Sequence, residues 1–192
     1  MKKIVVGIDF SSGSEAAIRA AMRLARHTGA EVCLVHCGVV PEHPVGIPHG
    51  LETTADAYNK ILAEHLASDR ARLEELHQRL SGQGVVVSQL VTDGFADTTL
   101  VKVADELGAE LMVLGTHGRT GVKRFLLGSI AERAVRLAGC NVMVARPADG
   151  TGPYQRILVP TDFSPSARRA LVTALSLAAP GATIDLLHCW QP

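Results

Sequence analysis

Three glycines, at 115, 118 and 128, have the spacing best suited to chemistry in this chain. They lie in the stretch Val113 to Ile130, V-L-G-T-H-G-R-T-G-V-K-R-F-L-L-G-S-I, where an apolar run leads into Gly115 and helical periodicity follows Gly128. A strand, a glycine-rich loop and a helix start present backbone N–H groups to an anion. Glycine also allows a phosphate to approach closely, because it has no Cβ. The spacing therefore predicts a phosphate-binding loop.

Two other apolar runs end in residues that suit a ligand site. The first run of the chain ends at Asp9, and the run that starts at Glu31 ends with His36 and Cys37. In a parallel sheet, ligands bind at the carboxyl ends of the strands, near the point where the strand order reverses. We therefore expect these residues and the glycine loop to lie together at one edge of a sheet.

The scaffold for these residues is a regular alternation of strand and helix patterns. Strands are predicted at residues 3–9, 31–38, 85–91, 110–114 and 141–146. Helices are predicted between Ser12 and Gly29 and at residues 53–80, 95–107 and 130–138, with Ser12 and Glu15 as a capping box. This order predicts an α/β fold, a five-stranded parallel doubly wound (Rossmann-like) sheet with helices on both faces.

Composition excludes several classes of function. The 192 residues are 47% hydrophobic and 20% charged, as in ordinary globular proteins. Lysine and arginine total 19, and so do aspartate and glutamate, so no overall positive field attracts nucleic acid or an anionic membrane. No apolar run approaches the roughly 18 residues of a membrane span, and Asp9 interrupts the apolar start before a secretory signal forms. We expect a cytoplasmic protein without a nucleic-acid or membrane partner.

The sequence repeats its own beginning near the C-terminus. K-I-V-V-G-I-D-F-S from Lys3 corresponds to R-I-L-V-P-T-D-F-S from Arg156. A-E-V-C-L-V-H-C from Ala30 corresponds to A-T-I-D-L-L-H-C from Ala182. The repeat thus contains a strand, a helix and a second strand, and it predicts the opening of a second domain of the same kind.

The repeat sets the expected domain organisation. Residues 147–155 have the composition of a linker between a first domain at 1–146 and a partial second repeat at 156–192. The second repeat contains Asp162 but no glycine loop, so we expect one ligand per chain. A fragment this short buries too little apolar surface to be stable alone. It is expected to pack on the first domain, to pair with another chain, or to be a truncated remnant.

These motifs together resemble the universal stress protein family. Gly115-x-x-Gly118-(nine residues)-Gly128-Ser129 is similar to the ATP-binding signature of that family. The D-F-S opening, the L-V-H-C strand and the run A-E-L-M-V-L-G-T-H-G-R-T-G are similar to it as well. The resemblance covers residues 1–146 and continues into the second repeat, as in a tandem member cut short. It implies an ATP-binding regulatory module of the stress response, with ATP and Mg²⁺ as cofactors.

The resemblance also implies a role for individual residues. Gly7 and Asp9 would contact adenine and ribose, Asp9 would reach Mg²⁺ through ATP, and Cys37 would line the adenine. Gly7 stands where proline is common, as Pro160 does in the second repeat, and Cys37 replaces an aliphatic residue. The residues that would follow the ribose and phosphates are Gly115, Thr116, His117, Gly118, Arg119, Thr120 and Gly121. Those that would hold phosphate oxygens at the helix start are Gly128, Ser129 and Ile130.

Several of these residues have a second interpretation. Asp9 also suits a cap for the helix that follows it, and His117 suits a loop-shaping hydrogen bond better than a catalytic base. Basic residues inside the loop, Arg119, Lys123 and Arg124, either neutralise phosphate or are solvated. The spacing of three histidines and a cysteine matches no standard zinc pattern, so no zinc site is predicted at His36, Cys37, His43 and His49.

The sequence predicts a regulatory nucleotide-binding protein with at most slow ATP hydrolysis, and two other functions remain open. One is a nucleotide-independent dimerisation or partner-docking protein, which forms a homodimer or an intramolecular pseudo-dimer through the edge strand 141–146. The other is an ATP pyrophosphatase-type enzyme, whose S-G-G-x-D-S loop is replaced here by F-S-S-G-S-E. The chain contains neither a G-x-S-x-G elbow nor a Walker motif.

Overall fold

The computed structural model describes residues 1–38, 55–116, 128–147 and 154–190. The chain forms two compact units, Met1–Asp149 and Gly150–Pro192, and each is described by itself. The first unit contains the sheet whose strand ends were expected to carry the ligand site. The second contains a shorter strand-helix-strand element.

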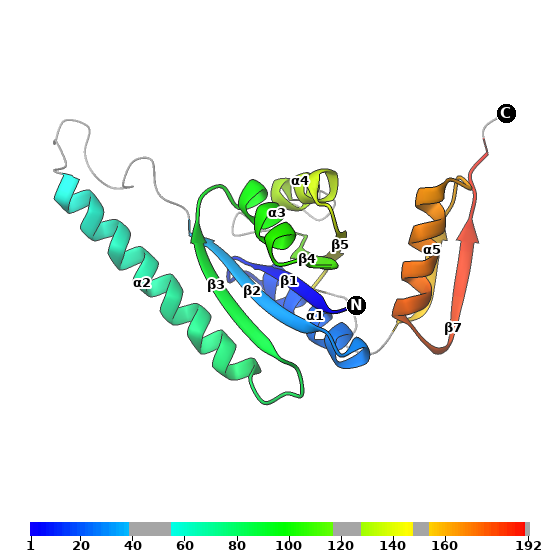
Figure 1. The fold of residues 1–192 in the computed structure, drawn as a ribbon, viewed down its shortest axis with the longest axis horizontal. Coiled ribbons are helices and arrows are strands. Elements are labelled where there is room, and N and C mark those ends of the chain that lie inside the picture. The colour runs from blue at the N-terminus through cyan, green and yellow to red at the C-terminus, as the bar shows by residue number, and fades with distance from the viewer. Residues whose placement is uncertain (39–54, 117–127, 148–153, 191–192) are drawn as a thin grey trace. The chain divides into compact units, whose positions relative to one another are not determined.

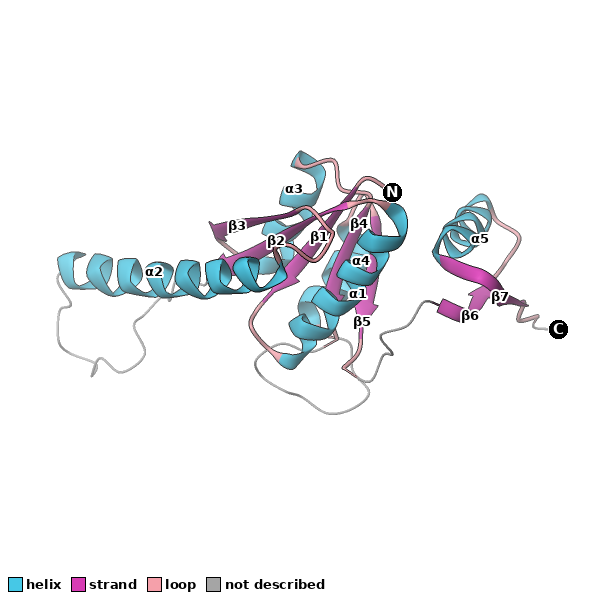
Figure 2. Ribbon diagram, turned by 90° about the horizontal axis from the view of Figure 1, so that it is seen from below, coloured by secondary structure: helices cyan, strands magenta, loops and turns pink. Residues whose placement is uncertain are grey.

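The first unit is built on a five-stranded sheet with the order β3-β2-β1-β4-β5 (Figure 1). Its elements are β1 (Lys3–Ile8), α1 (Ser12–Thr28), β2 (Glu31–Gly38), α2 (Ala55–Leu80), β3 (Val87–Asp93), α3 (Ala96–Glu106), β4 (Leu111–Gly115), α4 (Ser129–Leu137) and β5 (Asn141–Ala145). Every neighbouring pair of strands is parallel. The predicted parallel doubly wound sheet is confirmed, and Figure 2 shows the sheet from below, with β3 and β5 as its outer strands.

Helices cover both faces of this sheet. Figure 1 shows α3 and α4 above the sheet and α1 below it. Val5, Val35 and Met112 pack against residues of α3 and α4 and have no exposed surface. Because side chains alternate along a strand, the neighbouring Val6 and Leu34 face the other way and are equally buried. The sheet is thus buried on both sides, which explains why its strands read as continuous apolar runs.

Helix α1 begins and ends at residues that suit its two termini. Ser11 is its N-cap, and its hydroxyl accepts a hydrogen bond from the Ser14 amide at 3.3 Å. Gly29 closes the helix in the left-handed conformation, with φ 72°, as expected. The predicted capping box of Ser12 and Glu15 is wrong by one position, because Ser12 is already helical and Ser11 caps the helix instead.

Strand β3 lies two residues later than the sequence predicted. The amide of Val32 on β2 donates to the Val86 carbonyl at 2.9 Å, and strand pairing then runs from Val87 to Asp93. Since β2 extends to Gly38, its partner continues beyond the apolar run to remain paired with it. The position of β3 is therefore set by the length of β2 and not by local apolar residues alone.

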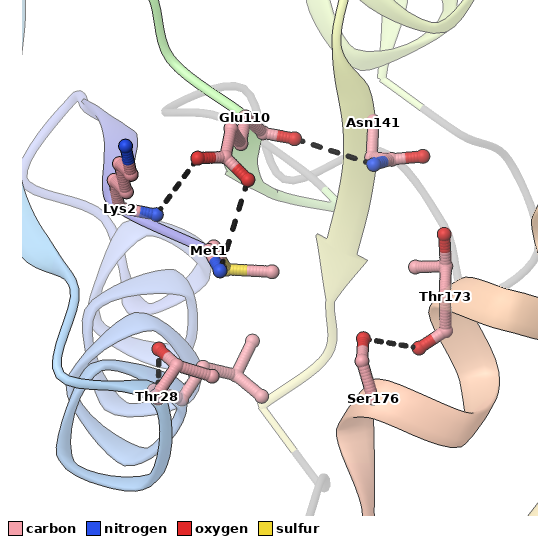
Figure 3. A network of polar contacts seen from close by, with 8 residues as sticks. Met1, Lys2, Thr28, Glu110, Asn141, Thr173 and Ser176 are labelled. Carbon is pink, nitrogen blue, oxygen red and sulfur yellow. Dashed lines mark hydrogen bonds and ion pairs between the residues drawn. The ribbon is translucent and has the colours of Figure 1, made fainter.

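Polar contacts join the amino ends of β1, β4 and β5, at the edge of the sheet opposite the expected site (Figure 3). The Glu110 carboxylate accepts a hydrogen bond from the Lys2 amide at 2.9 Å and lies 3.7 Å from the Met1 amino group. The Glu110 carbonyl accepts from Asn141 Nδ2 at 3.3 Å. These contacts tie β1, β4 and β5 together where no ligand is expected, so we assign them a structural role.

The second unit repeats the start of the first. It consists of β6 (Tyr154–Pro160), α5 (Pro165–Leu177) and β7 (Ala178–Leu187), and its two strands are parallel. Ser164 caps α5 by accepting a hydrogen bond from the Ala167 amide at 3.1 Å, as Ser11 caps α1. The C-terminal segment is thus a βαβ fragment with the opening architecture of the first unit.

Apolar positions of the second unit lack the cover that their counterparts have in the first. Leu158 is 60% exposed, whereas the corresponding Val5 on β1 has no exposed surface. Leu186 is also 60% exposed, whereas the corresponding Leu34 on β2 is fully buried. In the first unit Val5 is covered by α3 and α4, which follow later in the chain, and the βαβ fragment contains no corresponding helices.

Candidate functional site

The carboxyl ends of β1, β2 and β4 lie at one edge of the sheet, because the three strands are adjacent and parallel. Cys37 of β2 belongs to the same buried cluster as Leu114 of β4. A Cβ on Gly7 would lie 2.5 Å from Leu114 Cδ2, so the missing side chain at Gly7 leaves room for Leu114. Gly7 and Cys37 therefore face the side of the sheet that α3 and α4 cover.

The Cys37 side chain provides an apolar surface and not a nucleophile. It is 7% exposed, and burial raises the pKa of its thiol from 9.0 to about 11. The thiol is consequently neutral at physiological pH, and the thiolate is the form that reacts. A neutral thiol is a small apolar group, so it suits the adenine-lining position that sequence resemblance gave it.

Protonation of Cys37 should make the stability of the first unit depend on alkaline pH. The pKa is raised in the folded state, so unfolded chains lose the proton first and stability falls as pH rises above about 9. We expect a loss of about 2 kcal/mol between pH 7.5 and 10.5 from this group, measured by urea unfolding under reducing conditions. The Cys37→Val variant should lack this component. Equal pH slopes in the two proteins would contradict the assignment.

Gly115, at the end of β4, is in close contact with the backbone of α1. A Cβ at this position would lie 2.4 Å from the carbonyl carbon of Gly13 and 2.7 Å from its oxygen. Gly13 is buried in the first turn of α1. Two glycines therefore allow the end of β4 and the start of α1 to approach each other at backbone distance.

The two residues that flank the segment 117–127, Thr116 and Gly128, are hydrogen-bonded to each other. The Thr116 amide donates to the Ala145 carbonyl at 3.2 Å, and the Thr116 carbonyl accepts a hydrogen bond from the Gly128 amide at 2.8 Å. The second bond fastens the start of α4 to the end of β4. Loop residues expected to follow ribose and phosphates, His117, Gly118, Arg119, Thr120 and Gly121, lie outside the described residues, as do Lys123 and Arg124.

Helix α4 starts where the phosphate site was expected. Gly128 is its N-cap in an extended conformation, with φ −63°, and Ser129 and Ile130 are the first two helical residues. The amides of a first helical turn have no acceptor within the helix, and the helix dipole places partial positive charge there. The Gly128 amide is bonded to Thr116 in this structure, so Ser129 and Ile130 carry the remaining expected donors.

Asp9 supports the turn between β1 and α1. Its Oδ1 accepts hydrogen bonds from the Ser11 amide at 3.0 Å and from the Ser11 hydroxyl at 2.6 Å. The corresponding Asp162 accepts from the Ser164 amide at 2.9 Å, and hydrogen bonds from Ser164 lower the pKa of that carboxyl. The hydrogen bonds to Oδ1 agree with the capping interpretation of Asp9, and they fix where the carboxylate lies.

The histidine of β2 is not part of a metal cluster within the described part of the chain. No group of three or more His, Cys, Asp and Glu side chains suited to a metal occurs among the described residues. His36 instead lies with its Nδ1 2.7 Å from the Ile8 carbonyl oxygen and its Nε2 3.2 Å from Asp69 Oδ2 of α2. His43 and His49 lie outside the described residues.

Sequence reasoning missed three residues of this region. Gly13 was not singled out, although a glycine in the first turn of a helix is a sign of close packing. Phe10 and Asp69 were missed as well, and both take part in the contacts of His36. The internal repeat held a signal for the phenylalanine, because Phe10 and His36 recur together as Phe163 and His188.

Comparison with known proteins identifies the family of this arrangement. The sequence model of the universal stress protein family matches residues 1–146 and 153–192. The chain belongs to the universal stress protein family. Within it, universal stress protein MJ0531 of Methanocaldococcus jannaschii is 33% identical over 76% of this chain and 82% of that protein.

Solved structures of universal stress proteins share the fold. One from Archaeoglobus fulgidus matches with a TM-score of 0.75 and 18% identity, and the match covers 97% of this chain and 66% of that chain. A family protein of Arabidopsis thaliana, determined with AMP bound, matches with a TM-score of 0.53 and 15% identity, over 78% of this chain and all of its own. At these identities the likeness concerns the fold alone. Within the described ranges, no helix of this universal stress protein has the length and apolarity needed to cross a membrane.

Proposed function

We propose that this universal stress protein binds one ATP per chain at the carboxyl ends of β1 and β4. The observation that carries the proposal is the hydrogen bond from the Gly128 amide to the Thr116 carbonyl at 2.8 Å. It brings the two ends of the segment 117–127 together and places the start of α4 at the same sheet edge as Asp9. An AMP-bound relative of the same fold supports an adenine nucleotide as the ligand.

The residues at this edge fit ATP by their chemistry. The first-turn amides of α4, at Ser129 and Ile130, are donors of the kind that bind phosphate oxygens. The Asp9 carboxylate is a hydrogen-bond acceptor for ribose hydroxyls and an oxygen ligand of the kind Mg²⁺ prefers. Gly7 and Cys37 provide the apolar side for adenine. Residues from Gly115 to Gly121 complete the proposed site along the ribose and phosphates.

The proposed role is regulatory and not that of a fast enzyme. ATP occupancy would hold the segment 117–127 in one arrangement and shift an equilibrium of conformation or assembly. Mg²⁺, when bound, supplies charge neutralisation between Asp9 and the phosphates, and the expected hydrolysis is slow at most. This role is proposed to belong to a cytoplasmic stress response.

Valine at the loop glycines should remove ATP binding and preserve the fold. We expect Gly118→Val and Gly128→Val to weaken ATP at least about tenfold, because a branched side chain obstructs the approach of the phosphates. Gly128 has φ −63°, which valine also adopts, so the sheet should fold normally in that variant. Fluorescence competition gives the affinity, and circular dichroism checks the fold. Wild-type ATP affinity in both variants would rule out the loop as the phosphate site.

One observation favours a second function, docking without nucleotide. The exposed apolar side chains of the second unit, such as Leu158 and Leu186, occupy positions that are buried in the first unit. Large exposed apolar surfaces mark interaction sites in soluble proteins. A second copy of the chain, paired through β5 or through the second unit, would cover such a surface.

Light scattering on the full chain distinguishes the two functions. Docking predicts about twice the 20.3 kDa chain mass at micromolar concentration, with and without ATP. The Leu158→Glu variant should then return the protein to the monomer, and Val172→Glu, on an exposed position of α5, serves as the matched control. A monomer mass at all concentrations would exclude the homodimer.

A further inference from the structure

The turn between β1 and α1 contains a bulky residue in an unfavourable backbone conformation. Phe10 has φ 61°, in the left-handed region that glycine normally occupies. Such a conformation costs on the order of 1 kcal/mol or more and persists only where neighbouring groups hold it. Phe10 stands between Asp9 and Ser11, the two residues whose hydrogen bonds shape the turn. Whatever holds Phe10 therefore also fixes the Asp9 carboxylate.

Two side chains from elsewhere in the first unit hold the Phe10 ring. The His36 imidazole lies with its ring centre 4.7 Å from that of Phe10, at an interplanar angle of 45°. The Arg72 guanidinium of α2 lies over the Phe10 ring at 4.0 Å from its centre. Contacts of these kinds stabilise a fixed aromatic ring by about 1 kcal/mol each. Together they are of the size needed to offset the left-handed backbone at Phe10.

His36 is itself held through one ring nitrogen. It is buried, and Nδ1 lies 2.7 Å from the Ile8 carbonyl oxygen, which only accepts hydrogen bonds, so Nδ1 carries the proton. Nε2 lies 3.2 Å from the Asp69 carboxylate on α2, but it makes no hydrogen bond within the described part of the chain. The imidazole is thus anchored to the Ile8 carbonyl of β1, and its ring lies against that of Phe10.

The second unit contains the same arrangement. Phe163 has φ 64°, and its ring centre lies 4.7 Å from that of His188 at an interplanar angle of 49°. His188 Nδ1 lies 2.7 Å from the Thr161 carbonyl oxygen, which corresponds to that of Ile8. The turn therefore recurs wherever the D-F-S and H-C sequences recur. Its recurrence in a fragment without a glycine loop shows that the phenylalanine and the histidine form the turn without the nucleotide site.

We infer that His36 is a positioning residue, which holds the Phe10 turn and thereby places the Asp9 carboxylate for the nucleotide. Arg72 of α2 holds the Phe10 ring together with it. The inference rests on the proposed function for its nucleotide part, and on the turn geometry alone for its positioning part. It links α2, on the far face of the sheet from Cys37, to the affinity of the site.

Amide exchange tests the positioning step without any nucleotide. The Ser11 amide donates to Asp9 Oδ1, so its exchange rate measured by NMR reports whether Asp9 is held in place. We expect His36→Leu to raise that rate at least about tenfold, and His36→Asn, whose amide nitrogen can replace Nδ1 as donor, to restore most of the protection. His188→Leu is the matched control, which should accelerate exchange at Ser164 and not at Ser11.

A double-mutant cycle tests the link to the nucleotide. We expect His36→Leu to weaken Mg-ATP about tenfold in the wild-type background and to have no further effect in an Asp9→Asn background. A purely structural role would give the same loss in both backgrounds and would overturn the inference. An unchanged Ser11 exchange rate in His36→Leu would overturn it whatever the nucleotide result. If the Ser11 exchange rate rises in His36→Leu as expected but the protein binds no ATP, the proposed function and the nucleotide part of the inference are refuted together.

Discussion

The Gly115→Ala variant is expected to lose about 3 kcal/mol of folding free energy, the upper end of the range for overpacked sites. The added Cβ would lie 2.4 Å from the Gly13 carbonyl carbon, and a backbone atom cannot move aside as a side-chain tip does. Strand β4 and helix α1 must therefore separate. Thermal unfolding should show a fall in Tm on the order of 10 °C. ATP affinity should fall as well, because the carboxyl end of β4 moves away from that of β1.

Gly139→Ala is the matched control for this variant. A Cβ there would lie 3.1 Å from Asp105 Oδ1, the end of a flexible exposed side chain, so a small rotation relieves the contact. We expect its stability to remain within about 0.5 kcal/mol of the wild type. Equal stability of Gly115→Ala and Gly139→Ala would show that the glycine pair does not set the approach of β4 to α1.

The Asp9→Asn variant is expected to bind Mg-ATP at least about tenfold more weakly. Hydrogen bonds and metal contacts made by a charged carboxylate are stronger than those made by a neutral amide. The amide oxygen of asparagine still accepts from Ser11, so the turn and the cap of α1 remain. The loss should therefore concern the nucleotide and not the fold. It should also shrink when Mg²⁺ is removed, if Asp9 acts partly through the metal ion.

Asp162→Asn is the control, because Asp162 makes the corresponding bond to Ser164 in a unit without a glycine loop. It should leave ATP affinity unchanged. An equal loss of ATP affinity in the two variants would mean that ATP does not bind at a single site in the first unit. An unchanged affinity in Asp9→Asn would remove Asp9 from the site.

Much of the fold follows from local patterns. The glycine at 29 and the apolar runs of β2 and β4 placed most boundaries to within a residue or two, since period and caps are local properties. The parallel doubly wound class follows from the alternation of strands and helices together with right-handed crossovers, but these rules allow more than one strand order and do not select the observed β3-β2-β1-β4-β5. The position of β3 could not be predicted in the same way, because it depends on how far its partner β2 extends.

The site was predicted only in outline. The glycine spacing and the acid after β1 are visible in sequence, and so is their meeting at one sheet edge. The contact of Gly115 with Gly13 is not, because it joins residues far apart in the chain through their backbones. The same holds for His36, whose contacts come from a left-handed Phe10 and from Asp69, a residue of a different helix. A positive φ at a non-glycine residue cannot be recognised from composition or periodicity.

Calorimetric titration of the full chain with Mg-ATP tests the central claim most directly. We predict one binding site per chain, since only the first unit combines the acid after its first strand with the glycine segment and the start of α4. Binding should be complete well below ~1 mM, which corresponds to a binding free energy stronger than about −4 kcal/mol. No heat of binding at ~1 mM ATP, or two equivalent sites per chain, would contradict it.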